Sequence, residues 1–104
     1  MLDHREGAVA YFIRLLRFTP EGLRDLKQFR VKRAEFLEHC KKLGISLVAE
    51  YVTSGRYDLV TILEAPNLDT MLQLNAITGS KGRTIAETLS AIPAKDFEWV
   101  AESF

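Results

Sequence analysis

The sequence has few residues that could bind a metal or form a disulfide. Its 104 residues include one cysteine, Cys40, and two histidines, His4 and His39. A single cysteine cannot form an intrachain disulfide. On a helix, His39 and Cys40 point about 100° apart, so they do not converge on one metal ion. We therefore expect no metal and no cofactor, and no nucleophile–base pair identifies a catalytic residue.

Long apolar runs and a net charge are also missing. No apolar run approaches the ~20 residues that a helix needs to cross a bilayer, and 14 Lys and Arg residues balance 14 Asp and Glu residues. A neutral chain has no overall field that attracts nucleic acid or an anionic membrane. No N-terminal segment has the charged-then-apolar layout of a signal peptide. We therefore expect a cytoplasmic protein without nucleic-acid or membrane partners.

The composition that is present is typical of one globular domain. Hydrophobic residues make up 47% and charged residues 27% of the chain, which is ordinary for a folded protein. Residues 1–8 are mostly polar and predict a flexible lead-in, and residues 9–104 predict a single domain. A domain of this size buries only about 60 to 70% of its unfolded surface, so self-association would add to its core.

The first half of the domain predicts a strand followed by a broken helix. Residues 8–18 are rich in β-branched and aromatic residues, with apolar side chains on both alternating faces. Thr19 and Pro20 then predict a helix N-cap and first turn, and Gly44 predicts the helix end. A helix over 20–43 would be about 36 Å long, whereas an eight-residue strand spans about 27 Å. We therefore expect a break near residues 28–33.

The second half predicts two strands, a helix and a last strand. Residues 46–53 and 57–65 predict strands joined by a turn that needs the positive φ of Gly55. Asn67 caps a helix over 68–78, and residues 84–92 form a strand that Pro93 ends. The order β-α-β-β-α-β predicts an α+β, ferredoxin-like fold, with a four-stranded antiparallel sheet and both helices on one face.

One face of that sheet would be bare and apolar. In the third strand, Leu59 and Leu63 alternate with Val60 and Ile62, so both faces are apolar. A monomer rarely exposes more than a few hundred Å² of contiguous apolar surface. We therefore expect a second copy to cover this face, in a homodimer or a higher homo-oligomer.

Several segments together resemble the GYD domain family. They are "LLRFT" before the first helix, "KRAEFLEHCKKLG" at its end, "GRYDLV" at the hairpin, "EAP" before the second helix and "ETL" in the last strand. The family signature would be Gly55, Tyr57 and Asp58. The resemblance implies the dimeric α+β barrel, in which two ferredoxin-like sheets pack face to face. It does not imply one activity, because relatives on this fold include cofactor-independent oxygenases, isomerases, haem-handling proteins and effector-binding modules.

Three functions remain open from the sequence. The first is a small-molecule-binding or regulatory protein whose ligand is a small apolar or aromatic molecule. The second is a cofactor-independent oxygenase or isomerase that acts on such a molecule, and the third is a purely structural assembly module. The candidate ligand-binding residues are Phe12, Arg14, Tyr51, Tyr57, Asp58 and Met71.

Individual candidates also have structural interpretations. Arg14 is a charged residue within an apolar strand, and it either pairs with Glu50 or Asp58 or binds an anion. Tyr57 and Asp58 fit the architecture of a hairpin better than chemistry, because strand neighbours point to opposite faces. Cys40 belongs to an apolar helix stripe and is expected to be buried rather than nucleophilic.

The C-terminal segment, residues 95–104, carries a second apolar stripe. Phe97, Val100, Ala101 and Phe104 recur at helical spacing, with Trp99 off the stripe. So many aromatic side chains are expected to dock somewhere. They dock either on their own subunit or at the boundary with a second subunit.

Overall fold

The computed structural model describes residues 10–104, so the predicted lead-in over residues 1–8 lies outside the described residues. The elements are β1 (Ala10–Phe18), α1 (Pro20–Arg24), the 3₁₀ turn η2 (Leu26–Gln28), α2 (Phe29–Leu43), β2 (Ser46–Val52), β3 (Leu59–Ala65), α3 (Leu68–Gly79), β4 (Thr84–Ala91) and α4 (Ala94–Ala101). This order confirms the predicted β-α-β-β-α-β arrangement, followed by a C-terminal helix. No helix within residues 10–104 is long and apolar enough to cross a membrane.

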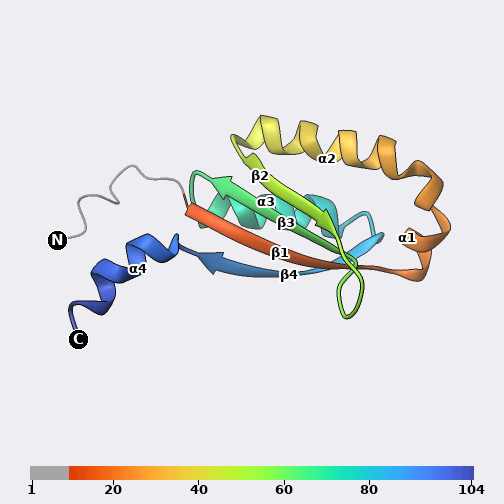
Figure 1. The fold of residues 1–104 in the computed structure, drawn as a ribbon. Coiled ribbons are helices and arrows are strands. Elements are labelled where there is room, and N and C mark those ends of the chain that lie inside the picture. The colour runs from red at the N-terminus through yellow and green to blue at the C-terminus, as the bar shows by residue number, and fades with distance from the viewer. Residues whose placement is uncertain (1–9) are drawn as a thin grey trace.

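The four strands form one antiparallel sheet in the order β2-β3-β1-β4 (Figure 1). The predicted ferredoxin-like fold is therefore confirmed. The buried core lies between one face of this sheet and the two long helices, because Phe12 and Leu63 from the strands cluster with Cys40 from α2 and with Met71 and Leu74 from α3. We call this the helix face of the sheet, and the opposite side the open face.

The helical connection between β1 and β2, which we call the first crossover, is broken, as predicted from the length of its helical segment. Helix α1 ends at Arg24, and η2 separates it from α2, so the break falls at residues 25–28, slightly before the predicted 28–33. The predicted caps are confirmed. The Oγ1 atom of Thr19 accepts a hydrogen bond from Gly22 N at 3.0 Å, and Gly44 ends α2 with φ 72°. The short α1 therefore turns the chain before α2 crosses back over the sheet.

Residues 53–58 form the turn between β2 and β3. Gly55 has φ 109°, which confirms that glycine is needed there. Thr53 Oγ1 donates to the Tyr57 carbonyl at 2.7 Å, and the Asp58 carboxylate accepts from Phe18 N at 2.9 Å. Asp58 therefore ties this turn to the end of β1, a structural role.

The open face of the sheet is apolar and is not covered by the two long helices. In the antiparallel register Ile13 pairs with Ile62, and Leu15 pairs with Val60. At the two edges, Tyr51 and Ile85 are 60% and 59% exposed. The prediction that β1 and β3 carry apolar side chains on both faces is confirmed.

Helix α4 projects beyond the end of β4 (Figure 1). Within residues 10–104 it packs against no other element to a substantial extent. Phe97 is more than half exposed and Phe104 is fully exposed. The apolar stripe of this helix is thus left largely uncovered by the described part of its own chain.

Candidate ligand-binding pocket

A pocket of about 120 Å³ lies between the helix face of the sheet and the broken crossover. Strands β1 and β3 supply its floor, while α1, η2 and the first half of α2 supply one wall. The loop between α3 and β4 closes one end. Because the crossover is broken at residues 25–28, the helices leave a hollow here instead of packing flat on the sheet.

Most of the pocket surface is apolar. Side chains from three directions contribute, namely Leu16, Phe18, Leu26, Phe29, Phe36 and Leu59. Phe18 and Phe29 meet edge to face, with ring centroids 6.4 Å apart and an interplanar angle of 78°. This is a favoured aromatic geometry, and it fixes two of the walls. Such a pocket suits a small molecule with an apolar body.

Arg14 is the charged group at the bottom of the pocket. It is only 2% exposed, its Nη2 donates to Thr78 Oγ1 at 2.9 Å, and its guanidinium carbon lies 5.6 Å from the centre of the Phe36 ring. Thr78 Oγ1 in turn donates to the Leu74 carbonyl, which keeps a lone pair directed at the arginine. Burial lowers the pKa of Arg14, because the charged form loses its hydration.

The expected carboxylate partner of Arg14 is absent from residues 10–104, which corrects one of the two predictions made for this residue. Glu50 instead forms an ion pair with Arg33, and Asp58 accepts from the backbone of Phe18. The Nε atom of Arg14 has no hydrogen-bond partner in the same range. Both candidate carboxylates are taken by nearer donors, so Arg14 keeps a buried and unneutralised charge.

Thr61 is a pocket residue that the sequence analysis missed. It lies directly opposite Arg14 in the β1–β3 register, is 1% exposed, and lines the pocket. Its hydroxyl has no hydrogen-bond partner in the described part of the chain. The signal that could have found it is a threonine inside the apolar segment LVTIL of β3, two positions from Leu59 and therefore on the same face of the strand.

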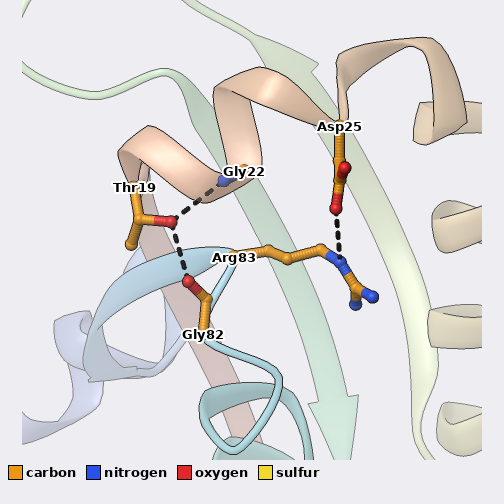
Figure 2. A network of polar contacts seen from close by, with 5 residues as sticks. All are labelled: Thr19, Gly22, Asp25, Gly82 and Arg83. Atoms are coloured by element: carbon orange, nitrogen blue, oxygen red, sulfur yellow. Dashed lines mark hydrogen bonds and ion pairs between the residues drawn. The ribbon is translucent and has the colours of Figure 1, made fainter.

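A polar network joins α1 to the α3–β4 loop (Figure 2), and three of its residues, Gly22, Asp25 and Arg83, line the pocket. Thr19 Oγ1 donates to the Gly82 carbonyl at 2.7 Å, and Thr19 N donates to the Arg83 carbonyl at 3.0 Å. Arg83 Nε reaches Asp25 Oδ2 at 3.4 Å. A Cβ atom on Gly22 would lie 2.1 Å from the Arg83 carbonyl oxygen, so only glycine permits this approach. These contacts hold α1 against the α3–β4 loop.

Cationic side chains outnumber carboxylates around the pocket. Five of its lining residues are basic, Arg14, Lys32, Arg33, Lys81 and Arg83, whereas three are acidic, Asp25, Glu35 and Glu50. The whole chain has no net charge. The local excess of positive charge is therefore a property of this site.

The six predicted ligand-binding residues do not come together. Of these, Arg14 alone lines the pocket. Phe12 and Met71 are buried in the core beside it. Tyr51 is paired with Val60 and lies on the open face, and the Tyr57 hydroxyl donates to Glu87 at 2.7 Å, which raises the pKa of that phenol. The ligand-binding role of these six residues stays a prediction, but the two tyrosines lie outside the space between sheet and helices.

Cys40 packs into the core from the buried side of α2, as expected. Burial raises the pKa of its thiol to about 11, so the nucleophilic thiolate is scarce near neutral pH. Across residues 10–104, no group of three or more His, Cys, Asp and Glu side chains is arranged to hold a metal ion.

Comparison with known proteins agrees with this fold. The GYD domain matches residues 12–101. A curated protein of Thermus thermophilus, named "Glutamine synthetase and cystathionine beta-lyase binding protein", is 30% identical over 86 residues, which cover 82% of this chain and 90% of the relative. Since the matched region takes in nearly all of the sheet, both crossovers and α4, the chain belongs to the GYD domain family.

Proposed function

We propose that this protein is a small-molecule-binding protein with a regulatory rather than a catalytic role. The observation that carries the proposal is the aromatic-walled pocket between the helix face and the broken crossover. A pocket with apolar walls and a few converging polar groups is the usual form of a ligand site. In the described residues, no histidine or carboxylate of the pocket is hydrogen-bonded to a hydroxyl or thiol nucleophile. This favours binding over the oxygenase or isomerase alternative.

A thermal-shift screen of small apolar and aromatic compounds tests this proposal. A ligand that binds the folded state should raise the melting temperature as its concentration rises. Leu59→Phe, which adds a ring to the pocket wall, should remove the response to a hit. Val31→Phe, on the exposed side of α2, should keep it. No response from a broad library would favour the assembly module instead.

We also propose that two copies associate through their open faces, as in a dimeric α+β barrel. The support is the set of apolar pairs at the centre of this face, Ile13 with Ile62 and Leu15 with Val60. Burying such a surface against its own copy would stabilise both subunits. Sedimentation at micromolar concentration should show a dimer or a larger oligomer, and a stable monomer would contradict this proposal.

A second candidate function is binding to a metabolic enzyme. The relative from Thermus thermophilus is named as a binding protein of glutamine synthetase and cystathionine beta-lyase, and the identity extends over most of both chains. By this proposal the present protein would bind one of these enzymes. Co-sedimentation with each purified enzyme from the same organism should detect a complex, and separate migration of all components would exclude it.

A further inference from the structure

We propose that the pocket binds a small organic anion, a carboxylate carried on a ring-sized apolar body, with Arg14 as its anchor and Thr61 as its second polar contact. This inference rests on the proposed small-molecule function and assigns the chemical class of the ligand. It begins from two buried atoms, Arg14 Nε and Thr61 Oγ1, that have no hydrogen-bond partner within residues 10–104.

Arg14 is a buried cation with no anionic partner among residues 10–104. Buried charges in proteins are normally paired, because removing an ion from water costs several kcal/mol. Here the guanidinium has one neutral acceptor, Thr78 Oγ1, and the ring of Phe36, while its Nε has no partner in the described chain. A ligand carboxylate would supply both the missing charge and the missing acceptor.

Thr61 provides a second unused donor at the same place. It faces Arg14 across the two central strands, and directly opposed residues have Cβ atoms about 5 Å apart on the same face of a sheet. Its hydroxyl is buried and has no partner in the described chain. A carboxylate with two oxygens can accept from the guanidinium with one and from the hydroxyl with the other.

Glu50 lies opposite Thr61 in the β2–β3 register, but the carboxylates near this position either have cationic partners of their own or are exposed to solvent. Glu50 is held by Arg33, and Asp25 is held by Arg83. Glu35 lines the pocket but is exposed to solvent. Lys32 and Lys81 add positive charge to the lining, which would raise the local concentration of an anionic ligand.

The size and the aromatic walls of the pocket indicate the shape of the ligand beyond its carboxylate. A cavity of about 120 Å³ is close to the roughly 150 Å³ of an engineered apolar cavity that holds benzene. The rings of Phe18, Phe29 and Phe36 line it, so a benzene-sized apolar body fits better than a fully hydrated phosphate or sulfate. A monoanion also loses less hydration on burial than a dianion.

An amide NMR titration with benzoate and with its neutral isostere benzamide tests the charge requirement. Benzoate should bind saturably and shift the amides around Arg14, Thr61 and Thr78. Benzamide should bind about 10- to 100-fold more weakly, the loss expected when a charge-assisted hydrogen bond becomes a neutral one. Equal affinity for the two compounds would overturn the anion assignment while leaving small-molecule binding intact.

Substitutions of Arg14 and Thr61 test whether these residues bind the carboxylate. Arg14→Met should weaken benzoate binding about 10- to 100-fold, and Arg30→Met, at an exposed arginine of α2 outside the pocket, should bind as the unaltered protein does. Thr61→Val keeps the shape of the side chain and should weaken binding several-fold, which tests the site even if Arg14→Met does not fold. Unchanged affinity in Thr61→Val and in a folded Arg14→Met protein would overturn the proposal.

Inorganic anions form the last arm of the titration. Phosphate and sulfate should bind more weakly than benzoate, since neither can contact the aromatic walls. Tighter binding of phosphate than of benzoate at Arg14 would overturn the organic part of the assignment. No saturable binding of benzoate or phenylacetate up to about 10 mM would overturn the inference as a whole. The proposed function would then be judged separately, by the response of Leu59→Phe to hits from the wider screen.

Discussion

The two faces of the sheet differ in which groups they bury. A stable monomer normally pairs its buried polar groups and covers its apolar surface, and neither face does so fully. The helix face buries a guanidinium and a hydroxyl without full partners in residues 10–104, at Arg14 and Thr61. The open face leaves aliphatic and aromatic side chains such as Tyr51 and Ile85 to solvent. Both arrangements cost stability in the isolated chain. From this difference we infer that each face is completed by a binding partner, a small anion on one side and a second copy on the other.

A charge at the centre of the open face should have the largest effect. Ile62→Lys places an ammonium opposite Ile13 in the register, and burying it against an identical face would desolvate two like charges. We expect the dimer dissociation constant to rise at least about 100-fold, as measured by sedimentation at several concentrations. Val31→Lys, on exposed α2, is the matched control and should remain associated.

Ile62→Lys should leave the pocket unchanged. The substituted side chain lies on the opposite side of the sheet, so benzoate binding measured on the monomeric variant should stay within about twofold. If Ile62→Lys lost benzoate binding as well as dimerisation, the two faces would not be independent.

The contact between α1 and the α3–β4 loop, which we call the pocket rim, should show the next largest effect. In Gly22→Ala the added Cβ would meet the Arg83 carbonyl oxygen at 2.1 Å, which forces α1 away from the α3–β4 loop. We expect a loss of about 2 to 4 kcal/mol of unfolding free energy, measured by denaturant titration. Gly79→Ala, whose Cβ would meet nothing within 4 Å, should be neutral or slightly stabilising. Equal effects from the two substitutions would contradict the role given to the rim.

The C-terminal helix belongs with the open face. Since α4 leaves β4 at the edge of the sheet and packs little within residues 10–104, we predict that it docks near the boundary between subunits. Removing residues 96–104 should weaken dimerisation by roughly tenfold and lower the melting temperature together. A truncated protein with an unchanged dimer dissociation constant would show that the helix stabilises only its own subunit.

The smallest effect on stability is expected from a substitution on the helix face, Arg14→Met. Replacing an incompletely paired buried charge by an apolar side chain of similar length is often neutral or stabilising, so Arg14→Met should unfold at the same free energy as the parent protein or up to about 2 kcal/mol higher. The measurement is denaturant unfolding without ligand. A loss of about 3 kcal/mol or more would identify Arg14 as a structural residue rather than a ligand anchor.

Cys40 reports on the same buried face. With a thiol pKa of about 11, only about 0.1% of the side chain is thiolate at about pH 8. A thiol-specific reagent should therefore label Cys40 near neutral pH only as fast as this part of the core opens. Rapid labelling of the native protein near neutral pH would show that this part of the core is open.

The features that follow from local pattern could be predicted from the sequence. Gly44 and Gly55 indicate a helix end and a turn because few other residues adopt positive φ, and Thr19 indicates an N-cap because its hydroxyl oxygen can accept from a backbone N–H of the first turn. The apolar alternation in β3 predicted two apolar faces because its period is tied to the strand. The broken crossover followed from comparing a helix length with a strand length.

The pocket could not be predicted in the same way. Its floor depends on a strand register that sets Thr61 opposite Arg14, two residues far apart in the chain. Which carboxylate pairs with an arginine depends on competition among donors, and Arg33 holds Glu50 while the backbone of Phe18 holds Asp58. Residue type alone suggested Tyr51 and Tyr57 as ligand contacts, whereas Tyr51 pairs with Val60 on the open face and the Tyr57 hydroxyl, from the turn before β3, donates to Glu87 of β4.

A crystal structure of the protein grown with benzoate would examine both faces at once. We predict a carboxylate in contact with Arg14 and Thr61 between the sheet and the broken crossover, and two copies packed through their open faces. Arg14 paired with Glu50 or another protein carboxylate, with benzoate elsewhere and the open face in solvent, would contradict this assignment of the two faces.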